Sequence, residues 1–204
     1  MVLTRIFRYD SLPDEKTAES GIEKEAARIC AAGKSGRARI ETLLAYGLLR
    51  EVLGEDFSPA RLRKDANGRP YLAGLPLDFN LSHTEGLIVC AVEKDAAQPR
   101  IGVDAEALRG RTAEEMNRIA ARWFTEKEQN QFLKNPTEEA FLQIWTAKEA
   151  MVKFIGTGLQ DVRKIETATE PFRLPDGTHV TLSRERIGDA FLTVCTRNQP
   201  LKKF

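Results

Sequence analysis

Two segments of this chain, about 100 residues apart, resemble one another. The first reads NLSHTEGLIVCAV over residues 80–92, and the second reads TLSRERIGDAFLTVCTR over residues 181–197. Each carries Leu-Ser, a glycine and an apolar run that reaches Val-Cys, as two strands joined by a turn would. The spacing is too long for a solenoid and favours two similar units. We therefore predict an α+β fold with an N-terminal subdomain over 1–100 and a C-terminal subdomain over 101–204.

Hydrophobic periodicity and turn residues give the expected order of helices and strands. The expected strands and extended segments are 2–9, 71–72, 79–82, 87–92 and the C-terminal tail, and the expected helices lie within 12–53, 112–134 and 136–155. Small residues at 31–36 should divide the first helical stretch in two. Its second half carries an apolar stripe that we expect in the core: Ile40, Leu43, Leu44, Gly47, Leu48 and Val52. Gly54 fits the end of that helix.

The composition narrows the classes of partner and compartment. Lys and Arg (31) almost balance Asp and Glu (30), so the net charge of +1 argues against nucleic acid or a membrane surface as the partner. No run of about 18 apolar residues and no signal-peptide core occur, so we expect a cytoplasmic protein. The cysteines, Cys30, Cys90 and Cys195, lack CxxC spacing and lie in apolar surroundings, which predicts buried free thiols rather than a zinc site.

The segment Ile101-Gly102-Val103-Asp104-Ala105-Glu106 is the first candidate for chemistry. Its apolar start indicates a strand, and the i, i+2 spacing places both carboxylates on one face. Hard oxygen ligands at this spacing suit Mg²⁺, which takes one or two carboxylates together with waters and phosphate oxygens. A solvated strand end would show the same two residues.

The second candidate is Trp145-Thr146-Ala147-Lys148-Glu149-Ala150-Met151-Val152-Lys153, in an expected helix. Trp145, Glu149 and Lys153 follow at i, i+4 and so share a face. Glu149 could bind a metal or accept a proton, while the Lys153 ammonium neutralises a phosphate. An ordinary solvated Glu-Lys pair remains the alternative.

The third candidate, Asn80-Leu81-Ser82-His83-Thr84, places a hydroxyl and an imidazole at the end of an apolar strand. Such groups could hold a phosphate or an adenosine moiety. A hydrolytic triad has little support because Ser82 and His83 lack an obvious third partner. The sequence contains no P-loop, GxGxxG or GxSxG motif.

Taken in order, NLSHT, IGVDAE, RWFTEKE and WTAKEAMVKFIGTGL resemble the Sfp-type 4′-phosphopantetheinyl transferases. The family pattern G-(I/V)-D-x-E followed by W-x-x-K-E-(A/S)-x-x-K is matched at every fixed position. The resemblance implies two α+β subdomains related by a pseudo-twofold, with coenzyme A and Mg²⁺ held between them. It implies transfer of phosphopantetheine from coenzyme A to a serine of an apo acyl or peptidyl carrier protein. A chain long enough for both units is expected to be a monomer.

The resemblance also implies roles for individual residues. Asp104, Glu106 and Glu149 look like the Mg²⁺ ligands, and Glu149 is the preferred base, with Glu106 or a metal-bound water as alternatives. Lys153 looks like a phosphate contact and, with Asp104 and Glu149, belongs to the catalytic set. The residues expected to bind coenzyme A are Arg69, Pro70, Ser82, His83, Lys148 and Lys153.

Two positions are less clear in the comparison with the family. Glu128 matches a family glutamate near the metal site but could equally be a first-turn helix carboxylate. Glu41 stands where the family often presents an arginine to the 3′-phosphate, and the candidates to replace that arginine are Lys34, Arg37 and Arg39.

Two other functions use the same residues. A Mg²⁺-dependent phosphohydrolase would act without an acceptor protein, and a non-catalytic module would bind coenzyme A or a carrier protein without turnover. For a carrier, typically acidic around its modified serine, we considered a basic patch as the docking surface. Its four members are Arg109, Arg111, Arg118 and Arg122, for which a solvated helix face is the alternative.

Overall fold

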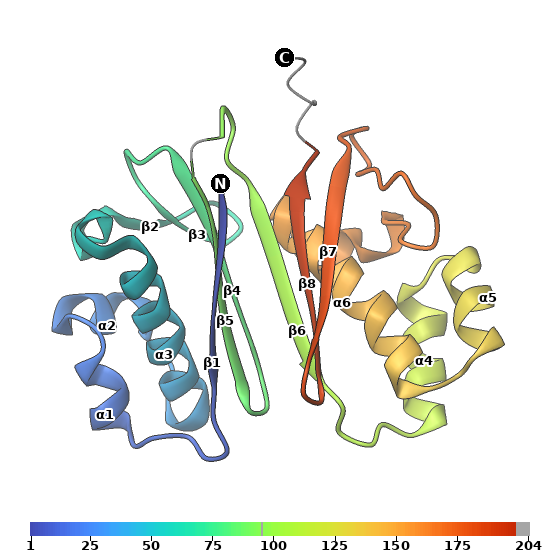
Figure 1. The fold of residues 1–204 in the computed structure, drawn as a ribbon, viewed down its shortest axis with the longest axis horizontal. Coiled ribbons are helices and arrows are strands. Elements are labelled where there is room, and N and C mark those ends of the chain that lie inside the picture. The colour runs from blue at the N-terminus through green and yellow to red at the C-terminus, as the bar shows by residue number, and fades with distance from the viewer. Residues whose placement is uncertain (95, 199–204) are drawn as a thin grey trace. The chain divides into compact units, whose positions relative to one another are not determined.

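The computed structural model describes residues 1–94 and 96–198. The chain divides into two compact units, Met1–Arg100 and Ile101–Phe204, and each is described by itself (Figure 1).

The N-terminal unit is built on a three-stranded antiparallel sheet. Its strands are β1 (Val2–Arg8), β4 (Leu77–Thr84) and β5 (Leu87–Lys94), in the order β1-β5-β4. A short hairpin of β2 (Leu62–Lys64) and β3 (Pro70–Leu72) precedes β4, with the Asn67-Gly68 turn between its strands. Central β5 is apolar from Leu87 to Val92 and buried throughout that run.

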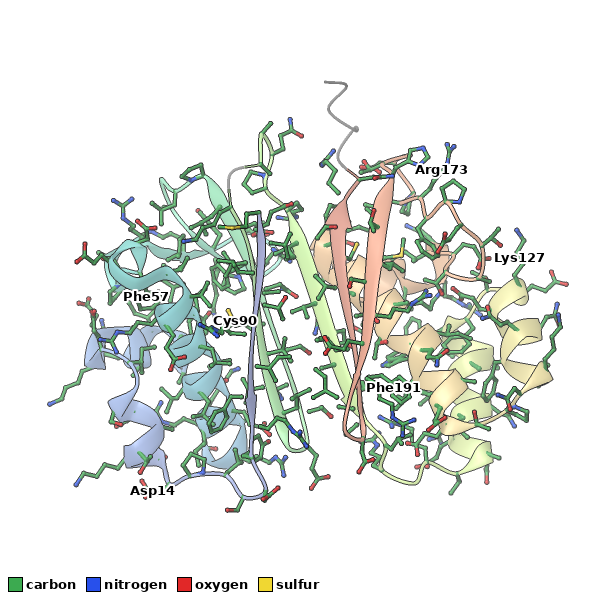
Figure 2. The ribbon with its side chains drawn as sticks, in the orientation of Figure 1. Asp14, Phe57, Cys90, Lys127, Arg173 and Phe191 are labelled. Carbon is green, nitrogen blue, oxygen red and sulfur yellow. The ribbon has the colours of Figure 1, made fainter. Side chains whose placement is uncertain are left out.

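Helices cover one face of this sheet (Figure 1). They are α1 (Glu15–Ser20), α2 (Lys24–Cys30) and α3 (Gly36–Leu53), followed by the 3₁₀ turns η1 (Gly54–Asp56) and η2 (Pro59–Arg61). The core between α3 and the sheet includes Leu43, Leu49, Phe79 and Cys90, the last labelled in Figure 2. The expected stripe on α3 is confirmed, and the helix ends at Gly54, whose φ of 56° is unfavourable for other residues.

The C-terminal unit repeats this plan. Its sheet contains β6 (Ile101–Ala107), β7 (Val180–Ile187) and β8 (Ala190–Arg197), in the order β6-β8-β7 and antiparallel throughout. The helices between β6 and β7 are α4 (Ala113–Trp123), α5 (Glu126–Lys134) and α6 (Glu138–Ile155), followed by the 3₁₀ segment η3 (Leu159–Lys164). The long helix α6 packs across β6 and β8.

The similar sequence segments occupy equivalent places in the two units. In the first hairpin Leu81 pairs with Cys90, and in the second Leu182 pairs with Cys195. The following serines pair with the preceding valines, Ser82 with Val89 and Ser183 with Val194. In each unit the second hairpin strand is central and pairs with the unit's first strand. The Leu-Ser and Val-Cys repeats therefore mark the same register in two sheets of the same strand order.

Helix boundaries differ from those expected in two places. The stretch before residue 31 is two short helices, because α1 ends at Gly21 and the side chain of Ile22 is buried. The expected helix at 112–134 is also interrupted. Phe124 adopts an extended conformation, and Thr125 starts α5 by accepting a hydrogen bond from the Glu128 amide in a capping box.

Among the described residues, no helix is both long and apolar enough to cross a bilayer. All three cysteines are free and buried, which confirms the expectation from sequence. Burial raises the pKa of the Cys30 thiol to about 11 and that of Cys90 to about 12, so neither thiol is readily ionised.

Gly102 lets α6 approach β6 closely. A Cβ at this position would lie 2.5 Å from the Phe154 amide nitrogen and closer still to the Ala150 carbonyl oxygen. Both atoms belong to the backbone of α6, so no side-chain rotation would relieve the overlap. Gly102 thus fixes how near the residues of α6 come to those of β6.

We expect Gly102→Ala to lower the free energy of unfolding by about 1–3 kcal/mol or more, because the helix must move away from the strand. Urea denaturation measures the change. Gly21→Ala is the control, because an added Cβ there would lie 3.6 Å from its nearest atom. Gly33 is unsuitable, because its positive φ would strain an alanine whatever the space around it. An equal loss in both variants would contradict the role of close packing at Gly102.

Candidate active site

Two carboxylates occupy alternate positions on β6. Asp104 and Glu106 project from one face of the sheet because strand side chains alternate. Their cross-strand partners on β8 are Thr193 and Phe191, respectively. Helix α6 covers this face, and its Lys153 reaches Asp104. The i, i+2 spacing in the sequence thus becomes an acidic edge beneath α6.

Glu149 and Lys153 lie one turn apart on α6, above that edge. Glu149 is partly buried, and the charges that act on it are those of Asp104, Lys153 and Glu106. One turn earlier, Trp145 is partly buried and stacks on Phe141 with ring centroids 6.2 Å apart. The helix therefore adds a third carboxylate and an ammonium to the two carboxylates of β6.

Two cations hold the β6 carboxylates. The Lys153 Nζ donates to Asp104 Oδ1 at 2.7 Å. The Arg111 Nη2 donates to Glu106 Oε2 at 2.7 Å, and its Nη1 donates to Glu138 Oε1 at 2.7 Å. The Arg111 side chain is only 4% exposed, so it is part of the buried frame of the site. Sequence reasoning missed this role because the partners of Arg111 lie on different elements.

Burial and repulsion by neighbouring charges shift Glu106 and Glu149 toward their neutral forms. Burial raises the pKa of Glu149 to about 7; the charge of Asp104 raises it further and the Lys153 ammonium opposes the shift. Burial also raises the pKa of Glu106, with a contribution from Asp104, while Arg111 lowers it. Three carboxylates close together in a partly desolvated place are costly unless a cation compensates them.

The donor set suits a divalent cation with hard oxygen preferences. Asp104, Glu106 and Glu149 supply carboxylate oxygens only, the ligand type that Mg²⁺ takes. Within residues 1–94 and 96–198, however, no three Asp, Glu, His or Cys side chains already stand in metal-binding geometry. A bound cation would compete with Lys153 for Asp104 and with Arg111 for Glu106. The residues fit Mg²⁺ in chemistry: burial chiefly raises the pKa of Glu149, and the charges of Asp104 and Glu106, which an added cation would offset, raise it further.

The pKa of Glu149 predicts how stability depends on pH in metal-free buffer. Glu149 has a folded-state pKa of about 7, above its ordinary 4.5, so the folded protein holds this proton more tightly than the unfolded chain does. The stability that this provides is fully present below pH 4.5 and is lost as the pH rises through 7. Between pH 4.5 and 8, the free energy of unfolding of the unmodified protein should fall by on the order of 3 kcal/mol relative to that of Glu149→Gln. Urea denaturation with chelator at several pH values measures this difference. A constant difference across that range would contradict the raised pKa.

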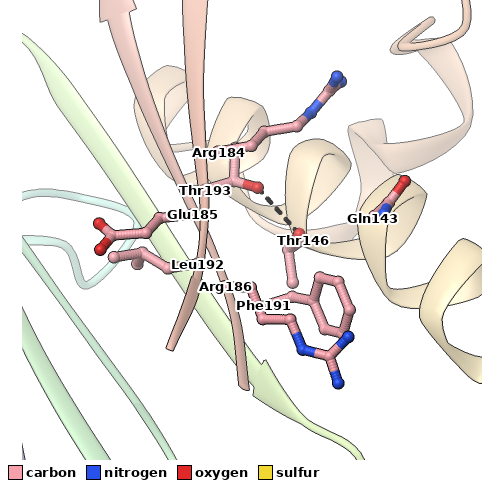
Figure 3. A pocket seen from close by; sticks show the side chains of 8 residues that line it. All are labelled: Gln143, Thr146, Arg184, Glu185, Arg186, Phe191, Leu192 and Thr193. Atoms are coloured by element: carbon pink, nitrogen blue, oxygen red, sulfur yellow. Dashed lines mark hydrogen bonds between the residues drawn. The ribbon is translucent and has the colours of Figure 1, made fainter. Parts of the chain in front are cut away.

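A small cavity of about 260 Å³ lies at the other edge of the same sheet (Figure 3). Arg184 of β7 pairs with Thr193 of β8, which in turn pairs with Asp104 of β6. The cavity lies at the Arg184 end of this row, and its described lining leaves out Asp104 and Glu149. Arg184 stacks over the Phe172 ring at 5.4 Å. The acidic edge and this cavity are therefore separate features of the C-terminal unit.

Comparison with known proteins identifies the family. Residues 100–195 match the model of the 4′-phosphopantetheinyl transferase superfamily. The 4′-phosphopantetheinyl transferase psf-1 of Bacillus pumilus is 30% identical over 194 residues, which cover 84% of this chain and 80% of that protein. The chain belongs to the 4′-phosphopantetheinyl transferase superfamily.

Other members of the superfamily align over shorter stretches. The 4′-phosphopantetheinyl transferase HetI of Nostoc sp. (strain PCC 7120) is 34% identical over 142 residues, or 63% of this chain and 58% of HetI. The 4′-phosphopantetheinyl transferase Sfp of Bacillus subtilis (strain 168) is 30% identical over 149 residues, or 66% of this chain and 63% of Sfp. Alignment with HetI and Sfp thus covers less than two thirds of either protein.

The superfamily match contains the acidic edge and the two charged residues of α6 above it. Asp104, Glu106, Glu149 and Lys153 all fall within residues 100–195, and the structure brings them together on β6 and α6. Their assignment as metal ligands and catalytic groups stays a prediction from the resemblance.

Lys148, expected to contact coenzyme A, is held by groups inside the C-terminal unit. Its side chain is fully buried, and its Nζ donates to Glu128 Oε2 at 2.6 Å and to the Ile165 carbonyl oxygen at 2.5 Å. An ammonium so enclosed cannot reach a bound phosphate without breaking these contacts. Contact with coenzyme A would compete with Glu128 and Ile165, and the assignment of Lys148 to coenzyme A stays a prediction.

Glu128 follows the second of its two interpretations. It is the N3 residue of the α5 capping box, is fully buried, and accepts hydrogen bonds from the Thr125 amide at 2.8 Å and the Thr167 amide at 2.7 Å. Its contacts are those of a first-turn helix carboxylate paired with Lys148. No described contact connects Glu128 to the acidic edge.

Adjacent residues of the N-terminal unit, Ser82 and His83, project from opposite faces of β4. Ser82 is 5% exposed, whereas the His83 side chain is 45% exposed on the α3 face, with Nδ1 3.4 Å from Glu41 Oε2. Alternation along the strand enforces this separation. A single phosphate contact shared by both side chains is therefore disfavoured, and each assignment to coenzyme A stays a separate prediction.

Arg69 and Pro70 lie at the start of β3. The Arg69 guanidinium is buried, and its Nη2 donates to Asp78 Oδ2 at 2.6 Å and to the Phe79 carbonyl oxygen at 3.2 Å. Pro70 pairs with Lys64 of β2. Arg69 thus braces the hairpin against β4, and contact with a ligand would compete with Asp78.

The three candidates for a 3′-phosphate contact have different surroundings. Arg39 bridges Glu15 at 2.5 Å and Glu19 at 2.6 Å, and Lys34 donates to Thr42 at 2.7 Å. Arg37 donates to Glu41 at 2.7 Å and retains a side chain that is 52% exposed. Glu41 also contacts His83, so Arg37 is the candidate placed beside that imidazole.

The basic patch considered from sequence is divided by the fold. Arg111 is buried between Glu106 and Glu138 and is no part of an exposed surface. Arg122 lies over the Trp123 ring at 4.8 Å. Arg109 and Arg118 are exposed. The four arginines thus do not form one docking surface, because one of them holds the acidic edge together.

Proposed function

We propose that this chain transfers the 4′-phosphopantetheine group of coenzyme A to a serine of an apo acyl or peptidyl carrier protein, with Mg²⁺ bound and release of 3′,5′-ADP. The proposal is supported chiefly by the convergence of Asp104, Glu106, Glu149 and Lys153 within the part of the chain that matches the superfamily. The curated relatives carry the name of this activity. We expect a cytoplasmic monomer, and the pseudo-twofold relation of the units stays a prediction of the resemblance.

The carboxylates of the acidic edge would hold the metal. Asp104 and Glu106 project from one strand and Glu149 faces them from α6, so oxygen ligands come from two rigid elements. When bound, Mg²⁺ would supply positive charge that neutralises the phosphate oxygens of coenzyme A. Because Mg²⁺ binding favours the ionised carboxylates, addition at pH 8 should stabilise the protein and stabilise Glu149→Gln far less.

Proton transfer and phosphate neutralisation fall to the residues of α6. Glu149, which faces the β6 carboxylates from α6, is the residue that would take the proton of the carrier serine. The serine oxygen then forms a bond to the β-phosphorus of coenzyme A, and the bond from that phosphorus to the bridging oxygen breaks. The electron pair leaves with 3′,5′-ADP. Lys153, once released by Asp104, would place its ammonium against the phosphates.

Product analysis separates this proposal from its alternatives. The protein is incubated with coenzyme A and Mg²⁺, with and without an apo carrier protein, and 3′,5′-ADP is measured by chromatography. Release that requires the carrier and stops with chelator is the expected result. Equal release without carrier would indicate a phosphohydrolase. Binding of coenzyme A with no release under either condition would indicate a binding module.

A further inference from the structure

A fully buried ion pair lies next to the acidic edge in sequence but faces another part of the unit. Lys148 immediately precedes Glu149 on α6, and both Lys148 and Glu128 have 0% side-chain exposure. The Lys148 Nζ contacts Glu128 Oε2 at 2.6 Å and the Ile165 carbonyl oxygen at 2.5 Å. Burial lowers the pKa of Lys148 and the Glu128 charge raises it, so the pair is mutually dependent.

The pair connects three segments of the C-terminal unit. Glu128 Oε2 accepts a hydrogen bond from the Thr125 amide at the start of α5, at 2.8 Å. Its other oxygen accepts from both the amide and the hydroxyl of Thr167 at 2.7 Å. Lys148 adds α6 and, through Ile165, the chain that follows η3. The Lys148 ammonium therefore holds α6 to the start of α5 and to the segment after η3, neither of which belongs to the acidic edge.

Directional contacts of this kind set position more effectively than apolar packing does. Most of the buried residues of α6 are apolar, including Phe141, Leu142 and Met151, and their contacts are non-directional. A buried ion pair is a weak source of stability compared with apolar side chains of similar volume. Its hydrogen bonds, however, are satisfied in one arrangement only. Its contribution is therefore to geometry more than to stability.

Resting on the proposed function, we propose that Lys148 and Glu128 are positioning residues that set the rotation and height of α6 over β6. They do not touch the reacting atoms. They act through Glu149, the next residue of α6, and through Lys153, whose ammonium lies 2.7 Å from Asp104. Gly102 fixes the distance between α6 and β6, and the Lys148 contacts fix the position of α6 along β6.

The test removes both charges together. In Glu128→Gln/Lys148→Met no buried charge is left alone, and Gln keeps an acceptor oxygen for the start of α5. With an apo carrier protein, kcat should fall about 10- to 100-fold, as for residues that orient metal ligands. The KM for coenzyme A should change less than about threefold, because ground-state contacts are kept. A folded double variant with unchanged kcat would overturn the inference.

A crystal structure of the double variant gives a readout that needs no turnover. We expect α6 to shift and the Lys153–Asp104 contact to lengthen from 2.7 Å. An unaltered contact would overturn the inference even if the unmodified protein had no transferase activity. If the double variant does not fold, Thr167→Val serves for both measurements, since it removes one hydrogen bond to Glu128 and leaves the two charges paired.

A matched control removes another buried polar contact of α6. Thr146 and Thr193 place their hydroxyls 2.9 Å apart between α6 and β8 (Figure 3). Thr146→Val/Thr193→Val should keep kcat within about threefold, because this pair does not connect α6 to α5 or to Ile165. A loss equal to that of the charged pair would show general sensitivity of α6 and overturn the assignment. Inactivity of the unmodified protein would refute the proposed function instead.

Discussion

Replacing Glu149 by glutamine is expected to lower kcat/KM for carrier modification by about 10²- to 10⁴-fold. Gln has nearly the same size but cannot accept the serine proton, and its amide is a poor substitute for a carboxylate ligand. The elevated pKa of about 7 comes from burial and from the repulsion by Asp104, so the active protein holds a costly carboxylate. In metal-free buffer at pH 8, the same substitution should increase stability. Activity and stability are thus expected to change in opposite directions.

Glu139→Gln is the matched control for that experiment. Glu139 lies on the same helix, with a side chain that is 49% exposed and paired with the equally exposed Arg186 at 2.7 Å. Its loss should change activity less than about twofold, as expected of a surface pair. Activity is followed by modification of an apo carrier protein with saturating Mg²⁺. Full activity in Glu149→Gln would exclude Glu149 as both base and essential ligand.

Lys148→Met alone is expected to lower the free energy of unfolding by about 3–5 kcal/mol. The substitution leaves the Glu128 carboxylate fully buried without the ammonium 2.6 Å away, although the amides of Thr125 and Thr167 still donate to it. Adding Glu128→Gln should recover much of the loss, because no charge then stays buried. Urea denaturation at pH 7 measures both values.

Lys127→Met is the control for the buried lysine. Lys127 is one residue before Glu128 on α5 and is exposed, as Figure 2 illustrates. Its substitution should alter stability by no more than about 0.5 kcal/mol. A similarly small effect of Lys148→Met would mean that the buried contacts of Lys148 carry little weight.

Local sequence patterns predicted the features of the fold that depend on neighbouring residues. Alternation on β6 anticipated that Asp104 and Glu106 share a face, and the four-residue spacing on α6 anticipated the approach of Glu149 and Lys153. The resemblance of the two hairpins reflects identical register, with Leu81 opposite Cys90 and Leu182 opposite Cys195. These relations follow from backbone periods alone.

Features that depend on long-range partners were not predictable in the same way. Lys148 in the motif reads like a phosphate contact, and only the fold shows that Glu128 and Ile165 enclose it. Arg111 likewise reads as part of a basic surface until β6 and α6 bring two glutamates to it. The opposite orientation of Ser82 and His83, by contrast, could have been expected from strand alternation.

The mass of an apo carrier protein after incubation with this protein, coenzyme A and Mg²⁺ tests the central claim most directly. We predict a gain of about 340 Da, the mass of the phosphopantetheine group, on acyl or peptidyl carriers. The gain should be absent with chelator, with Glu149→Gln, and with a carrier whose modified serine is replaced by alanine. No gain on several carriers of both classes, under conditions in which coenzyme A binds, would contradict the transferase assignment.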